Sequence, residues 1–400
     1  MDAIQQIQNF NRGRNTTGLK LKYSKMRESA FSFLRGSCHL FYARMAECLP
    51  LPDAPLTWIC GDLHLENFGS YKADDRRVYF DVNDFDEAVL APATWDLVRM
   101  LCSVELGAEA AGLSSLECRQ LAVAFLNAYA DALAKGEASW VEHKAANGLI
   151  RKLLDDVRTR ERKTLLDKYT DVHNKKRVFR LDGKRAFAAT AAQQQLVRDC
   201  MARVAGDVPN PDFYEVLDVA QRLAGTGSLG TERYLILVRG KGTPDGHYLL
   251  DLKLASSSSL EAHLHVTQPT WATQAHRIVG VQRRMQAVSM AFLQPVQIGD
   301  TAYVLRELQA SEDRITLQKD GHQSLSEHEG LLTTMGLVLA WAHLRSAGRD
   351  GSAPADALMT FGQSTAWKAP LHKAAESLTA QVRADWTDFT HAYDAGAMHA

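Results

Sequence analysis

The chain of 400 residues lacks several features that mark specialised protein classes. It has only six cysteines, with no C-x-x-C pair and none after Cys200, which disfavours a disulfide framework and a zinc site. A net charge near −1 argues against a general binder of nucleic acid or membrane surfaces. No apolar run approaches the roughly 20 residues of a membrane-spanning helix. The first residues show no apolar signal core. We therefore expect a cytoplasmic protein with reduced thiols and neither a membrane nor a nucleic-acid partner.

The composition is that of an ordinary globular protein, with 46% hydrophobic and 23% charged residues, and the length allows two lobes with full cores. Hydrophobic periodicity predicts helices and strands, with a strand-rich character from about residue 213 and a helical remainder. The predicted helices cover 28–48, 93–106, 115–134, 271–292, 326–345 and 366–394. The predicted strands cover 56–60, 77–82, 216–223, 234–239, 248–254 and 302–308. The first two strands are expected to pair as a hairpin, and the basic segment 151–185 to form a solvated helix and hairpin; a basic surface facing an anionic substrate is its alternative.

Two acidic segments follow the first two predicted strands. Gly61-Asp62-Leu63-His64-Leu65-Glu66-Asn67 places an amide five residues after a carboxylate, and Asn83-Asp84-Phe85-Asp86-Glu87 adds a second acidic loop. In phosphotransferases one carboxylate handles a hydroxyl proton, while an amide and another carboxylate hold Mg²⁺ beside a nucleotide phosphate. This spacing predicts Asp62 as the catalytic residue and Asn67 and Asp84 as metal ligands, since Mg²⁺ prefers oxygen.

A glycine-rich segment, Gly225-Thr226-Gly227-Ser228-Leu229-Gly230, lies between two predicted strands. That context disfavours a Rossmann site, where a helix follows the glycines, and favours a flap over phosphates. We expect Gly225, Gly227, Ser228 and Gly230 to contact the nucleotide. A plain hairpin is the alternative. Lys253, on the next strand but one, would hold the α- and β-phosphates unless it simply faces solvent.

Together these parts predict an ATP- and Mg²⁺-dependent phosphotransferase that acts on an unknown small-molecule or protein acceptor. In ordinary kinases the glycine loop and lysine precede the catalytic aspartate, whereas here they follow it. We therefore expect an α+β, bilobal, circularly permuted protein-kinase-like fold with a mostly helical large lobe and an antiparallel-sheet small lobe. Residues 1–205 would carry the catalytic and metal loops, 206–312 the nucleotide clamp, and 313–400 a helical segment that completes the large lobe.

The acidic segments resemble aminoglycoside and choline phosphotransferases. The first is similar to their H-G-D-L-H-x-x-N loop, with Cys60 in place of the leading histidine, and Asp84-Phe85-Asp86-Glu87-Ala88 to their I-D-[WF]-E-x-A stretch. Over about 30–346 the chain also resembles the bacterial domain of unknown function 2252 family. The segments that carry this likeness are Phe33–Gly36, Gly61–Gly69, Asn83–Glu87, Trp95–Leu97, Gly225–Gly230 and Ala340–His343. That family often has an acidic residue where Leu254 stands, so Glu261 is by position the candidate partner of Lys253.

Four further residues are supporting candidates. Asp96 is expected to brace the first acidic loop by accepting backbone N–H bonds, and His64 to bond the loop backbone. Asp86 is the second carboxylate of the metal loop. Arg35 either enters the site and binds phosphate or forms a buried salt bridge with Asp86 or Asp96, and the salt bridge is the preferred interpretation.

Three other functions remain open. A pseudokinase would bind nucleotide without turnover, and Cys60 and the unassigned partner of Lys253 favour it. A nucleotidyltransferase could use the same metal and phosphate groups. A metal-dependent phosphoesterase could use His64, Asp62, Asp84 and Asp86 for two metals, but it would leave the glycine loop and Lys253 unexplained.

Overall fold

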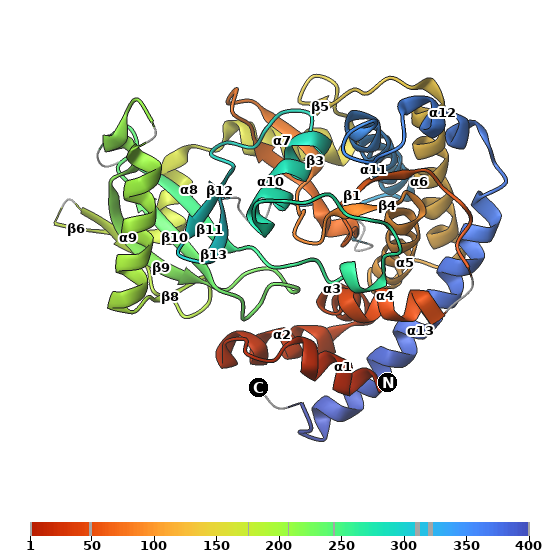
Figure 1. Ribbon diagram of the computed structural model, residues 1–400, viewed down its shortest axis with the longest axis horizontal. Coiled ribbons are helices and arrows are strands. Elements are labelled where there is room, and N and C mark those ends of the chain that lie inside the picture. Colours follow the sequence, from red (N-terminus) through yellow and green to blue (C-terminus); the bar gives the residue numbers. More distant parts are fainter. Residues whose placement is uncertain are drawn as a thin grey trace.

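The computed structural model describes residues 2–47, 50–174, 176–206, 208–242, 245–308, 313–318 and 323–398. Over these residues the chain folds as α+β, with helices gathered around the acidic loops and a six-stranded antiparallel sheet beside them (Figure 1). Five of the cysteines lie in the described part of the chain, and all five are free and buried, as expected. Among the helices of these residues, none combines the length and the apolar character needed to cross a membrane.

The helices of the described residues are α1 (Ala3–Phe10), α2 (Thr16–Glu28), α3 (Ala30–Gly36), α4 (Cys38–Glu47), α5 (Thr94–Ala110), α6 (Ser115–Lys135), α7 (Gly148–Thr159), α8 (Arg162–Tyr169), α9 (Ala191–Gly206), α10 (Gln274–Met285), α11 (Leu325–Ser346), α12 (Ala355–Gln363) and α13 (Lys368–Asp394). The two long central helices begin with reciprocal capping boxes, Ser114–Glu117 in α6 and Ser324–Glu327 in α11. In each box the serine and the glutamate satisfy two otherwise unpaired backbone donors. These local signals explain why both helices start close to their predicted positions.

The helix predicted over 28–48 is wrong as a single element. The chain turns at Ser29, which caps α3, and again at Ser37, so α3 and α4 are separate helices. A Cβ on Gly36 would lie 2.4 Å from the side chain of Met26 in α2, so the close packing of α2 and α3 requires glycine there. The break therefore coincides with two serine turns and with a close approach of α2, features that a period count over one segment does not register. The helix predicted at 271–292 is also shorter, covering α10 alone.

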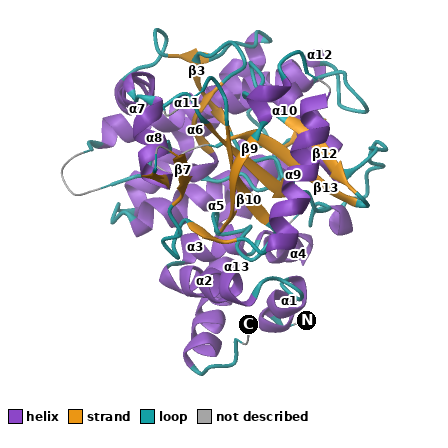
Figure 2. Cartoon of the chain, turned by 90° about the vertical axis from the view of Figure 1, so that its left-hand side faces the viewer, coloured by secondary structure: helices purple, strands orange, loops and turns teal. Residues whose placement is uncertain are grey.

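The large sheet runs in the order β12-β13-β11-β10-β9-β8, with all neighbours antiparallel. Its strands are β8 (Ala186–Ala188), β9 (Val216–Arg222), β10 (Arg233–Val238), β11 (Tyr248–Leu254), β12 (Gln294–Ile298) and β13 (Thr301–Glu307). One face packs on α9, through residues such as Tyr234 and Ile236 of β10 and Met201 of α9 (Figure 2). Alternation along β10 therefore turns Arg233 and Leu235 to the opposite face.

The remaining strands form three small sheets of the order β1-β4, β2-β3-β5 and β6-β7. They are β1 (Leu56–Ile59), β2 (Phe68–Lys72), β3 (Val78–Val82), β4 (Val89–Pro92), β5 (Val141–Glu142), β6 (Thr170–His173) and β7 (Lys176–Phe179). The predicted hairpin of 56–60 with 77–82 is wrong, because β1 pairs with β4 and β3 pairs with β2 and β5. The basic segment 151–185 forms α7, α8 and the β6–β7 hairpin, in line with the helix-and-hairpin prediction.

Candidate functional site

The first acidic loop leaves β1 and is anchored to α5. Asp96 accepts hydrogen bonds from the backbone N–H groups of Cys60 and Gly61, both at 3.0 Å, which is the bracing role that the sequence predicted. Gly61 has a φ of +80°, and a Cβ there would lie 2.4 Å from the carbonyl oxygen of Glu87. Only glycine fits this conformation and this approach, so the two acidic loops touch through their backbones.

Asp62 is held by an arginine that sequence reasoning missed. Arg99, on α5 and fully buried, forms an ion pair with the Asp62 carboxylate and donates to the carbonyl oxygen of Leu34 at 2.9 Å. Burial raises the pKa of Asp62, and Arg99 opposes that effect. The Asn67 amide nitrogen donates to the Asp62 carbonyl, so its side-chain oxygen is the atom left for a metal. The sequence offered one signal for Arg99: it is the single basic residue among the apolar residues of the helix predicted over 93–106, where a charge that turns inward needs a partner.

His64 and Arg35 lie on the same side of the site as Asp62. The His64 Nδ1 accepts from the Glu66 backbone N–H at 3.2 Å, so the histidine bonds the loop as expected. Burial lowers the pKa of His64 well below its ordinary value. The salt bridge predicted between Arg35 and Asp86 or Asp96 is wrong, since the partner of Arg35 is Glu66 at 2.9 Å. Glu66 lies within the predicted catalytic loop, nearer to α3 than the acids proposed from sequence.

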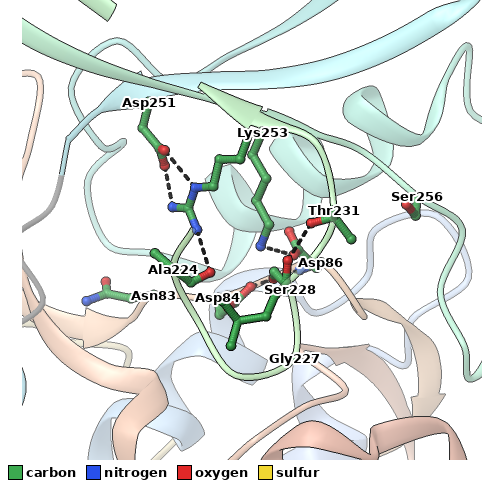
Figure 3. Close-up of polar contacts among 12 residues, drawn as sticks. Asn83, Asp84, Asp86, Ala224, Gly227, Ser228, Thr231, Asp251, Lys253 and Ser256 are labelled. Carbon is green, nitrogen blue, oxygen red and sulfur yellow. Dashed lines mark hydrogen bonds and ion pairs between the residues drawn. The ribbon is translucent and has the colours of Figure 1, made fainter. Parts of the chain in front are cut away.

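The second acidic loop is held by residues that come much later in the chain. Lys253 of β11 forms an ion pair with Asp86, so the candidate partner Glu261 is not the one observed (Figure 3). Arg277 of α10 donates to the carbonyl oxygens of Asp86 and Ala88. Figure 3 shows the Lys253 side chain directed toward Asp86, with Asp84 close by.

Asp84 is suited to hold a cation. Burial by itself would raise its pKa, but Lys253 and the arginines Arg306 and Arg314 hold the pKa below the ordinary value, so the carboxylate is ionised at neutral pH. Glu87, the neighbouring acid, is instead occupied by hydrogen bonds from the Ser259 backbone N–H and the hydroxyls of Ser258 and Ser259. Asp84 is therefore the carboxylate of this loop with capacity for a metal.

The glycine-rich loop joins β9 to β10 and is covered by the N-terminal segment. Arg14 donates to the carbonyl oxygens of Gly227 at 2.7 Å and Leu229 at 3.0 Å, and Lys22 donates to that of Gly227 at 3.0 Å. A Cβ on Gly18 would lie 2.5 Å from the Cα of Gly230, so α2 touches the loop backbone directly. These contacts occupy the loop carbonyls and were not predicted from the sequence.

A row of cations crosses the sheet beneath this loop. Strand register places Arg233 opposite Lys253, and Arg222 lies on the neighbouring strand β9. Like charges side by side in a sheet are destabilising. Asp251 compensates by pairing with Arg222 at 3.0 Å, with Arg233 and with Arg306 at 3.4 Å. One buried carboxylate against three arginines leaves an excess of positive charge, which suits an anionic ligand.

Both acidic loops, the glycine-rich loop, the N-terminal segment and the cation row border one cavity of about 660 Å³. The predicted site residues that line it are Arg35, Asp62, His64, Asn67, Asp84, Asp86, Gly225, Gly227, Ser228, Gly230 and Lys253. Asp96 does not line the cavity and acts on it through the loop that it braces. The cavity also contains residues that sequence reasoning did not select, namely Arg14, Lys22, Glu87, Arg222, Arg233 and Arg314.

Comparisons with known proteins give one match. No curated protein and no solved structure matches the chain at a significant level. The profile of the family described as "Uncharacterized protein conserved in bacteria (DUF2252)" matches residues 14–392, which is nearly the whole chain and includes both acidic loops and the glycine-rich loop. The chain therefore belongs to this bacterial family, DUF2252.

Proposed function

We propose that this protein is a Mg²⁺- and ATP-dependent phosphotransferase of circularly permuted, kinase-like architecture that acts on a hydroxyl acceptor. The observation that carries the proposal is the shared cavity, in which Lys253 and the glycine-rich loop face Asp62, Asn67 and Asp84. These groups come from opposite halves of the sequence. A random grouping of motifs would not be expected to converge on a single cavity large enough for a nucleotide.

The donor side follows the order found in kinases. The glycine-rich loop joins β9 to β10, and the lysine lies on the next strand, β11, antiparallel to β10. Kinases likewise place a glycine-rich loop over the phosphates and a lysine on the third strand. In this assignment residues 206–312 form the small lobe, and 1–205 with 313–400 form the large lobe. The cation row of Arg222, Arg233 and Lys253 adds positive charge for the nucleotide phosphates.

The metal side offers two protein oxygen ligands, the Asn67 side-chain oxygen and the Asp84 carboxylate. Mg²⁺ commonly takes one or two carboxylate or amide ligands and completes its shell with phosphate oxygens and water. Within the described part of the chain, no group of three or more His, Cys, Asp and Glu side chains could hold a metal ion. A site with so few protein ligands suits a metal ion that arrives with a nucleotide. A two-metal phosphoesterase site would need a larger set of protein ligands. Bound Mg²⁺ would neutralise charge on the transferring phosphoryl group.

Asp62 is the proposed base for the acceptor hydroxyl. Its carboxylate carries the ion pair from Arg99 on Oδ1, while Oδ2 lies 3.9 Å from the Cβ position of Gly227 and faces the glycine loop. Arg99 therefore orients the carboxylate and leaves one oxygen to receive a proton. A pKa raised by burial makes that oxygen a better proton acceptor than an exposed aspartate.

One departure from kinases favours a second candidate, a nucleotide-binding pseudokinase. The lysine of an active kinase pairs with a glutamate on the following helix. Helix α10, with the sequence QAHRIVGVQRRM, contains no acidic residue, and Lys253 pairs with Asp86 of the metal loop instead. In the phosphotransferase, Lys253 would release Asp86 when phosphates enter.

The proposal includes a cytoplasmic location, which suits the buried free thiols.

Calorimetry with ATP and Mg²⁺ tests the site. We expect wild type to bind in a Mg²⁺-dependent manner, and Asp84→Asn and Lys253→Met each to weaken binding at least tenfold. Lys72→Met, which removes an exposed lysine at the end of β2, serves as the control. Equal affinity in all four proteins would reject the assignment. Incubation of the active protein with a cell extract and either γ- or α-labelled ATP then separates phosphoryl transfer, nucleotidyl transfer and binding without turnover.

A further inference from the structure

Two arginines share one carboxylate at the side of the cavity formed by the predicted catalytic loop. Glu66 is 2.9 Å from Arg35 and 3.8 Å from Arg314. The three side chains are 12%, 34% and 20% exposed for Arg35, Arg314 and Glu66, so they are partly buried but open to the cavity that Arg35 and Arg314 line. The two guanidinium groups thus share Glu66 as a direct ion-pair partner, while Arg35 also acts on Asp62 and Arg314 on Asp84 through their charges.

The Arg35 guanidinium is held by an aromatic ring, and the chain that carries Arg314 is anchored through its backbone. Arg35 ends α3, and its guanidinium lies over the Phe31 ring, 5.6 Å from the centroid. Its buried Nε has no hydrogen-bond partner among the described residues, which is an unfilled donor. The backbone beside Arg314 is bonded to β2, because the Ser70 N–H donates to the Asp313 carbonyl at 3.0 Å. Two forked donors beside one carboxylate, one of them with an unfilled Nε, are suited to a carboxylate or phosphate.

Arg35 and its partner Glu66 border the predicted catalytic residue Asp62. Glu66 lies in the loop between Asp62 and Asn67, and the positive charge of Arg35 acts to lower the pKa of Asp62. The cations assigned to the nucleotide, including Lys253 and Arg233, are on the sheet across the cavity. The arginine pair is therefore on the wall that carries Asp62, where an acceptor hydroxyl must lie.

We propose that Arg35 and Arg314 form an acceptor subsite for an anionic group, so that the substrate is a hydroxyl compound that also carries a phosphate or a carboxylate. This inference rests on the proposed phosphotransferase function and specifies its acceptor. Two guanidinium groups at this wall disfavour cationic acceptors such as amino sugars or choline, because a further cation beside them would be repelled. Entry of the anion displaces Glu66 from one or both arginines.

The test uses the full-length protein saturated with Mg²⁺ and a non-hydrolysable ATP analogue, so that the donor site is filled. Calorimetric titrations then compare inorganic phosphate, acetate and the cation choline. We expect one of the two anions to bind in the low millimolar range or tighter and choline not to bind. Stronger binding of phosphate indicates a phosphorylated acceptor, and stronger binding of acetate indicates a hydroxy acid. Absence of binding by both anions, or equal binding of choline, overturns the proposal.

Three variants test whether these residues bind the anion: two should lower the affinity for the anion and the third should raise it. Arg35→Gln and Arg314→Gln should each weaken binding of the anion about tenfold. Their effect on the affinity for the ATP analogue should be smaller, even for Arg314, whose charge also acts on the proposed metal ligand Asp84. Glu66→Gln frees both arginines and should strengthen anion binding severalfold, which a merely structural role would not produce. Arg12→Gln, a cavity-lining arginine bonded to Asn9, is the charge-matched control and should leave anion binding unchanged.

The failure of this inference is distinguishable from failure of the proposed function. If wild type does not bind the ATP analogue with Mg²⁺ at all, the phosphotransferase proposal fails and the acceptor subsite falls with it. If the analogue binds normally but the arginine variants weaken the analogue and not the anion, Arg35 and Arg314 hold the donor phosphates. That second result overturns the acceptor assignment alone.

Discussion

The two acidic loops differ in what holds them. The loop of Asp62 is fixed mainly by residues near it in sequence, because Asp96, Arg99 and Ser103 all lie on α5. The loop of Asp84 and Asp86 is instead fixed from a distance, by Lys253, Arg277 and other residues between 253 and 306. The first loop can therefore form with the helical part of the chain. The second acquires its geometry only when the sheet and α10 pack against it.

This difference has a functional consequence under the proposed mechanism. The carboxylate that would accept the proton has an arrangement independent of the nucleotide-binding sheet, whereas the carboxylate that would hold Mg²⁺ depends on that sheet. Nucleotide binding and metal binding would then be coupled through the same contacts. Variants that disturb one loop at a time should separate the role of Asp62 from that of Asp84.

The largest effect is expected for Asp251→Asn, which leaves the buried Arg222 and Arg233 and the partly buried Arg306 without this carboxylate. Removing one partner of a buried ion pair costs about 3–5 kcal/mol, so unfolding in urea at pH 7 should show a loss in that range. Burial by itself would raise the pKa of Asp251, but Arg233 and Arg222 lower it well below 3.8. The pKa of Asp251 is lower in the folded than in the unfolded protein. The ionised carboxylate therefore contributes fully to the free energy of unfolding above the unfolded pKa of about 4, and this contribution is lost as the pH falls through the folded pKa.

The stability difference between wild type and Asp251→Asn should therefore shrink on acidification below about pH 4. Arg27→Gln, which breaks a largely exposed ion pair with Asp394, provides the control and should change stability far less. A gap between wild type and Asp251→Asn that stays constant down to the acid limit of folding would contradict the assigned ionisation of Asp251.

The next pair of variants tests the comparison directly. Arg277→Met removes donors to the carbonyls of Asp86, Ala88 and Ser256, and we expect it to weaken Mg²⁺-dependent ATP binding at least tenfold. Arg99→Met removes the partner of Asp62 and should mainly lower the turnover rate, with ATP affinity retained. Calorimetry and an ATPase assay measure the two effects. If both variants lose ATP affinity and turnover rate in the same proportion, the two loops act as one unit, and the distinction drawn between them is wrong.

A smaller effect on affinity is expected where the N-terminal segment meets the glycine-rich loop. Gly18→Ala would place a methyl group 2.5 Å from the backbone of Gly230, so α2 must move away from the loop. We expect a threefold to tenfold loss of ATP affinity with folding preserved. Gly330→Ala in α11, where a Cβ meets nothing within 4 Å, is the matched control and should bind ATP like wild type. Unchanged affinity in Gly18→Ala would show that α2 does not position the loop.

The smallest effect is expected for Ser259→Ala. This change removes one hydroxyl bond to Glu87, while the Ser259 backbone N–H and the Ser258 hydroxyl continue to donate to the same carboxylate. A hydrogen bond to a charged group is worth about 1.5–3 kcal/mol, and because two other donors remain on Glu87, urea unfolding should register a loss at or below the lower end of that range. Because this bond holds the second loop from a distance, a loss of several kcal/mol would mean that the docking of residues 253–306 depends on it.

The sequence by itself determined the local elements and the chemical inventory of the site. Periodicity located α6 and α11, whose capping boxes the structure then showed, and short spacings located Asp62, Asn67, Asp84 and the glycine-rich segment. Such signals are local, since helix and loop geometry depend on residues within a few positions of one another. The bracing role of Asp96 was predictable for a similar reason: it opens the helix that follows the acidic loops.

Only the tertiary structure decided which distant groups meet. The partner of Lys253 lies 167 positions away, and Arg14 reaches the glycine-rich loop across 213 positions. The pairing of β1 with β4 and the break between α3 and α4 likewise depend on how the whole core packs. Long-range ion pairs and strand pairings are chosen by the packing of many side chains at once, and no short window of sequence contains that information.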